Sequence, residues 1–499
     1  MVKFAEMANQ NPWWKYDKGF QRFDKDLEAL ADQMIPIERR RIELQRGDIA
    51  IIRGCRQIGK TTYLKTLVSQ LVKEGVEPRR IMYLSVDRLV GSRRELRGAL
   101  DLFLRRNMDA EEVYIFLDEI TALKDWNLEL KTMSDSGTTQ KVRLMVTGSS
   151  GAALRSSGEQ LPGRGLEGNE YYMKPLSFRE FTLQTIDTFT SRAQSNELVQ
   201  ALTRLKEILQ ATKISLAEDI DKLVETSDRV LPFQEELTYL YGHYSKCGGF
   251  PVSINSYLKS TTEGKKWLIE PRIAETFVRT TLGELAKYGK SEATARQLLN
   301  EIIAKYGTMF SFTSMSDVVN HVTTINYLDF LEKSFILHIL YAIDLNKKAP
   351  KYKGKKKVYF QDPFIYYSIK SWLTGTDVNE AASQILDDEV QLSEIVEGTV
   401  VSHLTMSMEA PYLKEKDTFT WFYYDSSGRE IDNVVMRNGS YQGIEVKYRN
   451  NVGPGDVTRA SGIEEYVILS RDDFVVTEDT CVIPVCVYLS LLEHSKHNL

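Results

Sequence analysis

The 499-residue sequence contains only four cysteines, Cys55, Cys247, Cys481 and Cys486. Four cysteines are too few for a disulfide framework in a chain of this length, and none of them forms the CxxC pair that is typical of structural zinc sites. The last two lie in an apolar, strand-like segment, where a small buried side chain is a better interpretation than a metal ligand. The cysteine content therefore predicts neither a disulfide scaffold nor a zinc module.

The sequence also lacks a hydrophobic run of about 18 residues, the length that a membrane helix needs. Residues 1–6 lack the apolar core of a signal peptide, so we expect a cytoplasmic protein with no membrane partner. The formal net charge of −5 argues against a uniformly basic nucleic-acid-binding surface but leaves room for a local basic patch. The length predicts about three domains.

One glycine-rich segment, residues 54–62, has the pattern GxxxxGKT. It follows the apolar run 49–52 and precedes the helix-like segment 63–68, which predicts a strand, a phosphate-binding loop and a helix in that order. The alternative is a chance glycine-rich turn between a strand and a helix, which the matching flanks disfavour.

The loop residues predict how a nucleotide would be held. Gly54 and Gly59 allow the backbone to point its N–H groups inward, and the positive end of the helix dipole faces the same cavity. We expect ATP here, with Lys60 on the β- and γ-phosphates and the Thr61 hydroxyl on Mg²⁺. The expected nucleotide-binding residues are Gly54, Cys55, Arg56, Gln57, Ile58, Gly59, Lys60, Thr61 and Thr62.

A second apolar run, residues 113–117, ends in Asp118 and Glu119. Such a run predicts a buried parallel strand, which we expect beside the strand of the phosphate loop. Asp118 would then meet Mg²⁺ through water, and Glu119 would polarise the attacking water. A core strand with a polar end is the simpler alternative, disfavoured by the order of the two motifs.

Two more strands are expected at residues 80–87 and 142–146, and the second ends in the hydroxyl-rich segment 147–150. Strands that alternate with helical stretches predict a parallel α/β sheet. Small hydroxyl side chains at its carboxyl edge would lie near the γ-phosphate.

Several further motifs make a family resemblance explicit. They are the segment LPGRG at 161–165, the segment YYMKPLSFREF at 171–181 and the segment GGFP at 248–251. Together with the phosphate loop they resemble the archaeal-type AAA ATPases of prokaryotes, which are related to the STAND NTPases. The loop departs from that family because Cys55-Arg56-Gln57 replaces the commoner paired arginines.

The resemblance implies roles for three residues that composition and spacing do not assign. Ser149 would sense the γ-phosphate, Arg164 would act near the nucleotide as a sensor or arginine finger, and Pro251 would lie near the base. For Arg164, a solvated loop arginine is the alternative.

The segments that follow are mainly helical. Residues 186–245 predict a helical insertion, with one helix over 195–209 and one over 216–244, each with an apolar face. The insertion would be either a lid or an interaction arm for a partner. Residues 275–345 predict three short helices and then strands, the order of a winged helix, which the resemblance also implies. The third helix, near Thr323, carries Asn326, Asp329 and Glu332 but no arginine, which makes direct base readout doubtful.

The predicted wing is rich in lysine. Residues 347–357 hold seven lysines around one proline and one glycine. Such a hairpin tip could neutralise the phosphates of DNA, although a solvated hairpin with solubilising charge is the alternative.

The C-terminal part carries a third constellation of acids. Asp432, Glu445 and Lys447 fall on one face of two adjacent predicted strands, because side chains repeat with period two. Glu397 precedes them and opens an expected helical run. In this order they resemble the PD-(D/E)xK nucleases. The resemblance implies Mg²⁺ ligands at Glu397, Asp432 and Glu445 and a catalytic Lys447. A nuclease-like fold retained for binding without cleavage is the alternative.

The sequence thus predicts an α/β protein with a P-loop parallel sheet, a helical lid, a winged helix and a restriction-endonuclease-like domain. The expected boundaries are 1–46 for an N-terminal segment, 47–255 for the ATPase, 256–360 for the winged helix and 361–499 for the nuclease-like domain. The expected function is ATP hydrolysis, with Lys60, Glu119 and Arg164 catalytic, coupled to DNA binding. The alternative is a signalling or scaffold ATPase whose C-terminal domain docks a partner; a homo-oligomer is left open.

Overall fold

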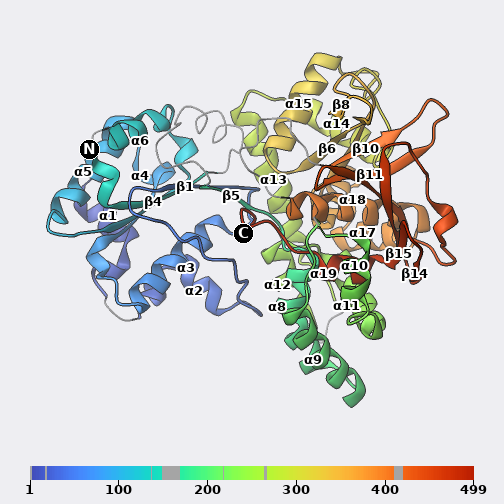
Figure 1. The fold of residues 1–499 in the computed structure, drawn as a ribbon. Helices are drawn as coiled ribbons and strands as arrows, with labels where there is room; N and C mark the ends of the chain where they lie inside the picture. Colours follow the sequence, from blue (N-terminus) through green and yellow to red (C-terminus); the bar gives the residue numbers. More distant parts are fainter. Residues whose placement is uncertain are drawn as a thin grey trace. The chain divides into compact units, whose positions relative to one another are not determined.

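The computed structural model describes residues 3–16, 19–135, 137–148, 169–216, 218–262, 267–408 and 420–499. The chain divides into two compact units. The first comprises Met1–Lys174, Lys333–Phe335 and Lys496–Leu499, and the second comprises Pro175–Glu332 and Ile336–Ser495 (Figure 1). The predicted boundaries near residues 46, 255 and 360 stay predictions. None of the helices in these ranges is long and apolar enough to cross a membrane.

The first unit contains a parallel five-stranded sheet in the order β2-β3-β4-β1-β5. Its strands are β1 Ile49–Gly54, β2 Ile81–Ser85, β3 Val113–Asp118, β4 Val142–Thr147 and β5 Glu170–Met173. Its α-helices within the described residues are α1 Phe4–Gln10, α2 Lys25–Ala31, α3 Lys60–Lys73, α4 Val86–Leu89, α5 Arg93–Arg106 and α6 Trp126–Asp135. The predicted mixed α/β fold with a parallel sheet is confirmed.

One prediction about this sheet is wrong. The strand of the acidic motif, β3, does not pair with the strand of the phosphate loop, β1, because β4 lies between them. A hydrophobic run indicates that a strand is buried. Strands with similar runs fit equally well at several positions of a sheet, so the order of the strands is set by the segments that connect them. The consequence is favourable for a nucleotide site, since the end of β4 comes to lie between the two motifs.

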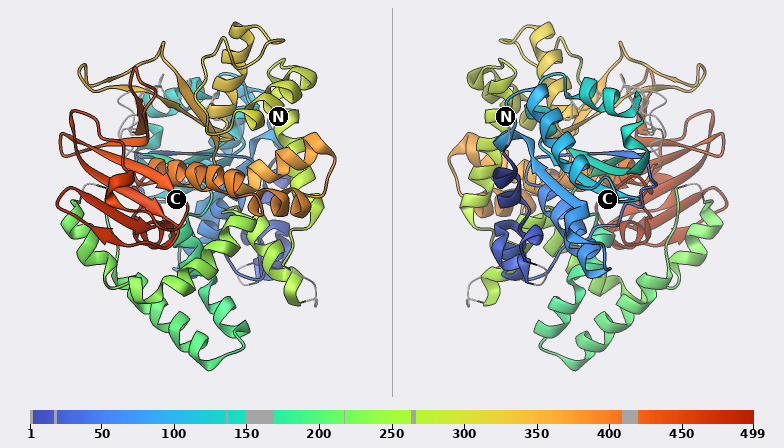
Figure 2. Two further views of the ribbon diagram at one scale, coloured as in Figure 1. Left: turned by 90° about the vertical axis from the view of Figure 1, so that its right-hand side faces the viewer. Right: turned by 90° about the vertical axis from the view of Figure 1, so that its left-hand side faces the viewer.

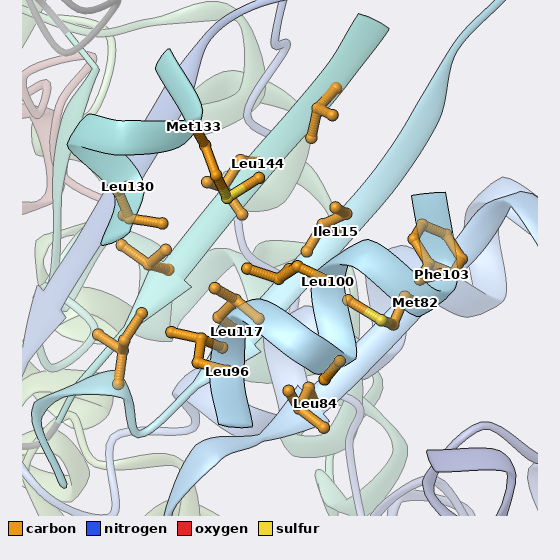
Figure 3. Close-up of a cluster of buried hydrophobic side chains, with 14 of the residues drawn as sticks. Met82, Leu84, Leu96, Leu100, Phe103, Ile115, Leu117, Leu130, Met133 and Leu144 are labelled. Atoms are coloured by element: carbon orange, nitrogen blue, oxygen red, sulfur yellow. The ribbon is translucent and has the colours of Figure 1, made fainter. Parts of the chain in front are cut away.

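Apolar side chains from helices α5 and α6 pack on one face of the sheet (Figure 3). Leu96, Leu100 and Phe103 of α5 are each at most 2% exposed, as are Ile115 and Leu117 of β3. Helix α5 is amphipathic, with its apolar residues at helical spacing, and Ser92 caps its first turn. This packing fixes β3 in the sheet and with it the acids at its carboxyl end.

The N-terminal segment covers the outer edge of strand β2. The Asn11 side chain makes two hydrogen bonds to the backbone of Tyr83. Its Nδ2 donates to the Tyr83 carbonyl at 2.8 Å, and its Oδ1 accepts from the Tyr83 N–H at 2.7 Å. The indole N–H groups of Trp13 and Trp14 both donate to Ile81 O. An edge strand otherwise exposes unpaired backbone groups, so the aromatic N-terminal segment completes the sheet.

The second unit begins with helices and continues into a hairpin and a second sheet. Its helices are α8 Phe178–Arg192, α9 Asn196–Ala211, α10 Ile220–Ser227, α11 Gln234–Cys247, α12 Pro251–Thr262, α13 Pro271–Lys287, α14 Glu292–Ala304, α15 His321–Lys333, α16 Pro363–Thr374, α17 Val378–Leu386, α18 Glu389–Ser407 and α19 Val485–Leu491. The strands of the hairpin are β6 Leu337–Tyr341, β7 Ile343–Asp344, β8 Ala349–Pro350 and β9 Lys356–Phe360. Three helices, α13 to α15, thus precede a hairpin, which is the predicted order; the winged-helix assignment stays a prediction.

The C-terminal sheet has six strands in the order β10-β11-β12-β13-β15-β14. They are β10 Thr420–Tyr424, β11 Glu430–Arg437, β12 Ser440–Lys447, β13 Ile463–Ser470, β14 Val475–Val476 and β15 Thr480–Pro484. Helix α18 runs along this sheet (Figure 2). Ala342 of the hairpin bridges to Phe422 of β10, and Ile343 joins the apolar cluster of the sheet. The hairpin is therefore packed against the C-terminal sheet.

Two expectations about helices need correction. The predicted long helix over 216–244 is two helices, α10 and α11, because the chain turns at 228–233, where Pro232 cannot continue a helix. Glu397 does not open a helix; it lies in the middle of α18, which begins at Glu389 after the cap Asp388. The carboxylate of Glu397 is therefore presented by a rigid helix.

Candidate functional site

The phosphate loop lies between strand β1 and helix α3, as predicted. Gln57 and Gly59 have φ angles of +60° and +99°, which turn the backbone into a tight loop. A Cβ on Gly54 would lie 2.3 Å from the carbonyl oxygen of Met173, so this position requires glycine. The Lys60 Nζ donates to the carbonyls of Gly54 and Cys55 at 2.8 Å each. The loop therefore curls around the end of the Lys60 side chain.

Asp118, at the end of β3, is the centre of a hydrogen-bond network beside this loop. Its Oδ2 accepts from the Thr61 hydroxyl at 2.6 Å and from the Tyr83 hydroxyl at 2.7 Å, and its Oδ1 accepts from the Thr147 hydroxyl. Asp118 is 2% exposed. A buried carboxylate is stable only when its oxygens are compensated, and three hydroxyl groups compensate it here. The predicted Mg²⁺-facing groups Thr61 and Asp118 are thus brought together.

Glu119 follows Asp118 in a left-handed conformation, with φ +53°. Its N–H donates to Asp118 Oδ1 at 3.2 Å and to Thr147 Oγ1 at 3.4 Å, which fixes the backbone where the side chain leaves the strand. A non-glycine residue with positive φ carries backbone strain, which a functional site can impose.

Tyr83 and Thr147 are members of this site that sequence reasoning missed. Tyr83 lies in β2 and is 4% exposed, and Thr147 is fully buried at the end of β4. Burial raises the pKa of the Tyr83 hydroxyl far above its ordinary value, and the neighbouring Asp118 adds to the rise, so this hydroxyl remains a proton donor. Thr147 stands in the hydroxyl-rich strand end, so its signal was present in the sequence. No sequence signal indicated the role of Tyr83, because an aromatic residue in a strand is usually a core residue.

The structure does not test three further predicted nucleotide-binding residues. Ser149 and Arg164 lie outside the described residues. Pro251 opens helix α12 in the second unit, whereas the loop belongs to the first. Their roles stay predictions.

The C-terminal acids converge within the second unit on a residue that was not predicted to be there. Lys357 of strand β9 places its Nζ 2.7 Å from Glu397 Oε1 and 3.4 Å from Asp432 Oδ1, and it also pairs with Glu430. The Lys357 side chain is 3% exposed. We call Lys357, Glu397, Glu430 and Asp432 the carboxylate cluster. Glu430 lies two residues before Asp432 on β11, a spacing that puts both on one face of the strand.

The predicted pair Glu445 and Lys447 stands next to this cluster. Asn433 is opposite Ile444 in the antiparallel ladder, so Asp432 and Glu445 come from adjacent positions of neighbouring strands. The Lys447 Nζ lies 2.8 Å from Glu445 Oε2, and Val446 N–H donates to Asp432 Oδ2 at 2.9 Å. The four predicted residues thus share one region, as expected.

The charged groups in this region shift one another's pKa values. Burial and the neighbouring Asp432 raise the pKa of Glu397 to about 7, although Lys357 opposes the rise. Burial by itself would lower the pKa of Lys357, but the carboxylates of Glu397, Asp432 and Glu430 raise it well above its ordinary value. The ammonium group of Lys357 therefore stays charged at neutral pH.

A magnesium ion fits the two sites differently. Beside the phosphate loop, Thr61 and Asp118 offer the hard oxygen atoms that Mg²⁺ prefers. In the carboxylate cluster the oxygens of Glu397 and Asp432 already face an ammonium group. No group of three or more His, Cys, Asp or Glu side chains among the described residues is arranged so that it could hold a metal ion. The ligand roles of Glu397, Asp432 and Glu445 stay predictions, and we derive no step through a metal there.

The lysine-rich hairpin differs from the prediction in one respect. Lys356 and Lys357 are buried, 2% and 3% exposed, so they cannot neutralise the phosphates of DNA. Lys356 donates to two carbonyls of its own loop, Tyr352 O and Gly354 O. The exposed lysines of the hairpin are Lys347, Lys348, Lys353 and Lys355, and Lys351 is half-buried. The basic surface thus contains five lysines at the tip.

Comparisons with known proteins cover the chain in three segments. Residues 46–182 match the family model of an AAA domain. The segment that contains the phosphate loop is thus similar to AAA domains. Residues 239–376 and 392–488 match two families described as domains of unknown function, DUF8612 and DUF4143.

Two further matches extend beyond single domains. An uncharacterized protein of Methanocaldococcus jannaschii is 26% identical over 345 residues, which make up 68% of this chain. The match spans 65% of that relative's own length, slightly less than two thirds. Among solved structures, the Aeropyrum pernix ORC1 protein in complex with DNA aligns at 12% identity and a TM-score of 0.29, and the alignment covers 70% of this chain and 91% of that one.

The motifs PLSF and GGFP meet inside the second unit. Leu176 N–H donates to Gly249 O at 2.8 Å, and Gly249 N–H donates to the buried Asp362 at 2.8 Å. A Cβ on Gly249 would lie 2.1 Å from Leu176 O, so the close contact requires glycine. Burial raises the pKa of Asp362 to about 7. The glycines of GGFP therefore serve the packing of this junction.

The same junction reaches helix α18 through a histidine. Phe178 N–H donates to His403 Nε2 at 2.7 Å, and His403 Nδ1 lies 2.7 Å from Thr399 O. Because a backbone N–H can only donate, Nε2 is unprotonated and Nδ1 carries the proton. Burial and, to a smaller extent, the neighbouring His494 lower the pKa of His403 to about 3. His403 thus holds the helix that carries Glu397 against the start of α8.

Proposed function

We propose that this protein is an ATP-hydrolysing AAA-type ATPase whose second unit binds DNA. The observation that carries the first part is the network around Asp118. One buried carboxylate meets the hydroxyl of Thr61 from the phosphate loop, and the next residue, Glu119, is held at the end of the same strand. The predicted phosphate-binding and water-activating groups are therefore neighbours.

Each group has a separate part in the proposed reaction. Lys60 would exchange its two loop carbonyls for phosphate oxygens, which are stronger acceptors because they are charged. Thr61 and Asp118 would hold Mg²⁺, which neutralises phosphate charge when it is bound with ATP. Glu119 would orient the attacking water and accept its proton. Ser149 and Arg164 would contact the γ-phosphate, as the resemblance implies.

An ATPase assay with two lysine variants tests this proposal. Lys60→Ala should lower the rate at least 100-fold, because catalysis of phosphoryl transfer depends on charge stabilisation. Lys73→Ala is the matched control, since Lys73 is exposed at the other end of the same helix. Equal rates for Lys60→Ala and the wild-type protein would contradict the proposal.

The second part of the proposal rests on the lysines at the hairpin tip. Four exposed lysines and one half-buried lysine gather within nine residues, enough to contact several phosphates of one DNA backbone. The exposed positions of helix α15 include Val322, Ile325 and Asp329 and hold no lysine or arginine. Binding should therefore be electrostatic and insensitive to base sequence.

For the C-terminal sheet, two functions remain in competition. The PD-(D/E)xK resemblance favours Mg²⁺-dependent cleavage with Lys447 as the catalytic lysine. The ammonium group of Lys357 among the carboxylates favours the second candidate, a nuclease-like domain that binds without cleaving. A nicking assay with Mg²⁺ or Mn²⁺ distinguishes the two candidates, with Asp432→Ala as control. Only the first candidate predicts that the wild-type protein cleaves DNA and that the variant does not. A cytoplasmic location and a homo-oligomer stay predictions from the sequence.

A further inference from the structure

We propose that the ammonium group of Lys357 is the resident cation of the carboxylate cluster and keeps divalent metal ions out of it. This inference concerns the second unit alone. It goes beyond the proposed ATPase and DNA-binding functions, and its failure would leave both unaffected.

The geometry of Lys357 matches the requirements of an ammonium group. It has three N–H donors, and three carboxylates surround it, with Glu397 at 2.7 Å, Asp432 at 3.4 Å and Glu430 as the third partner. Its side chain is 3% exposed, whereas those of Glu397 and Asp432 are 15% and 16% exposed. The lysine thus lies beneath the acids, on the protein side of the cluster.

The hairpin fixes the direction of this side chain. Lys357 lies opposite Leu340 and Tyr359 lies opposite His338 in the ladder of β6 and β9. The Tyr359 hydroxyl also bonds to Glu397, so the strand contacts this carboxylate at two points two residues apart. Lys356, on the other face of the strand, is held by Tyr352 O and Gly354 O. Lys357 could therefore leave the cluster only if the backbone of β9 shifted or the Lys357 side chain adopted a different conformation.

A divalent cation and this ammonium group would compete for the same oxygens. Magnesium and manganese need several oxygen ligands at about 2.0–2.2 Å around one point. The inner oxygens of Glu397 and Asp432 instead face Lys357. A metal ion could gather them only after Lys357 had left, and two cations at one point would repel each other.

Manganese binding to the full chain without nucleotide tests the inference. The variant Lys357→Met removes the ammonium group and keeps an unbranched side chain of similar length. We expect it to gain one Mn²⁺ site that binds at least tenfold more tightly than any site of the wild-type protein. The site should disappear again in Lys357→Met/Asp432→Asn. Lys353→Met, at an exposed lysine of the same hairpin, is the matched control and should bind Mn²⁺ as the wild-type protein does.

Thermal unfolding gives a readout that does not depend on activity. The variant leaves three carboxylates without their cation, so its melting temperature should fall and Mn²⁺ should restore it, while Mn²⁺ leaves the wild-type value unchanged. If Lys357→Met fails to fold without metal, the proposal requires that Mn²⁺ during purification rescues it. Three results would overturn the proposal: tight Mn²⁺ binding by the wild-type protein that Asp432→Asn abolishes, a folded variant without a new site, or no rescue by Mn²⁺.

Discussion

The hydroxyl group of Tyr83 donates a 2.7 Å hydrogen bond to Asp118 Oδ2, the oxygen that also accepts from Thr61. Tyr83 thereby holds the carboxylate that the proposed mechanism uses for Mg²⁺. Its own backbone is paired with Asn11 of the N-terminal segment. A residue more than 70 positions away in the sequence thus supports a strand of the candidate site.

Removing the Tyr83 hydroxyl should slow hydrolysis while leaving nucleotide binding intact. A hydrogen bond to a charged group contributes roughly 1.5–3 kcal/mol, so Tyr83→Phe should lower kcat by about tenfold or more. The affinity for ATP should change less than about twofold, because Lys60 and the loop are untouched. Steady-state kinetics and nucleotide titration measure the two effects. Tyr114→Phe on the neighbouring strand is the control, and an equal loss in both variants would contradict a positioning role.

Asn11 should stabilise the first unit although it lies outside the AAA match. Its side chain is fully buried and satisfies the N–H and the carbonyl of Tyr83. Asn11→Ala leaves both groups unpaired in the interior, which should cost about 2–4 kcal/mol of unfolding free energy. Chemical denaturation monitored by hydrogen exchange of the β2 amides measures this. Asn9→Ala, an exposed neighbour, should change stability by less than about 0.5 kcal/mol. Equal stability of both variants would show that the segment is not part of the sheet.

His403 should make the second unit less stable in acid. Its folded-state pKa of about 3 lies below the ordinary value of 6.5, so the unfolded chain binds the proton more readily between these values. Stability is therefore present above pH 6.5 and is lost as the pH falls toward 3, by about 1.4 kcal/mol per unit. Urea unfolding of the wild-type protein at pH 7.5, 6.5 and 5.5 measures the slope.

The variant His403→Gln isolates this contribution, because glutamine does not titrate. Its unfolding free energy should be lower at pH 7.5 but should fall less steeply toward pH 5.5 than that of the wild-type protein. His321→Gln, at an exposed position, should keep the wild-type slope. Parallel slopes for wild type and His403→Gln would mean that His403 is not held neutral by the Phe178 N–H.

The tip of the hairpin should account for the salt dependence of DNA binding. Each lysine–phosphate contact contributes about 0.9 to the slope of log K against log salt for duplex DNA. Replacing Lys347, Lys348, Lys353 and Lys355 by serine should lower that slope by about 3–4 and weaken binding at least tenfold. Fluorescence anisotropy at several salt concentrations measures both.

Four other exposed lysines and the buried Lys356 serve as references for this experiment. Serine at the exposed positions Lys25, Lys73, Lys213 and Lys287 changes the net charge equally and should lower the slope much less. Serine at the buried Lys356 should alter stability rather than salt dependence, because its amine bonds to loop carbonyls. DNA binding that survives the loss of the four exposed tip lysines would contradict the proposed surface.

The sequence predicted those parts of the candidate site that depend on neighbours along the chain. Each of these parts is contained in one short segment, whose pattern indicates both the local conformation and the chemistry. They are the phosphate loop, the strand end with Asp118 and the pair Glu445 and Lys447. The period of two along β11 and β12 correctly put Asp432 and Glu445 side by side. These features need no knowledge of which segments meet in space.

Other features depend on contacts between distant segments and could not be predicted. Strand order in the first sheet placed β4 between β1 and β3, although all three have similar apolar runs. Tyr83 and Glu430 belong to no motif, so the sequence indicated no role for either of them. Lys357 was grouped with the basic tip because adjacent lysines read as a charged loop, whereas strand β9 is covered on both faces and buries it.

Single-turnover measurements on Glu119→Gln test the central claim, ATP hydrolysis at the Asp118 network, most directly. The account predicts that this variant binds ATP with an affinity within a few-fold of the wild-type value, because Lys60, Thr61 and Asp118 are unchanged. It also predicts at least a 100-fold loss in the rate of hydrolysis, so that ATP stays bound and intact. Hydrolysis at the wild-type rate, or a loss of ATP binding equal to the loss of rate, would contradict the account.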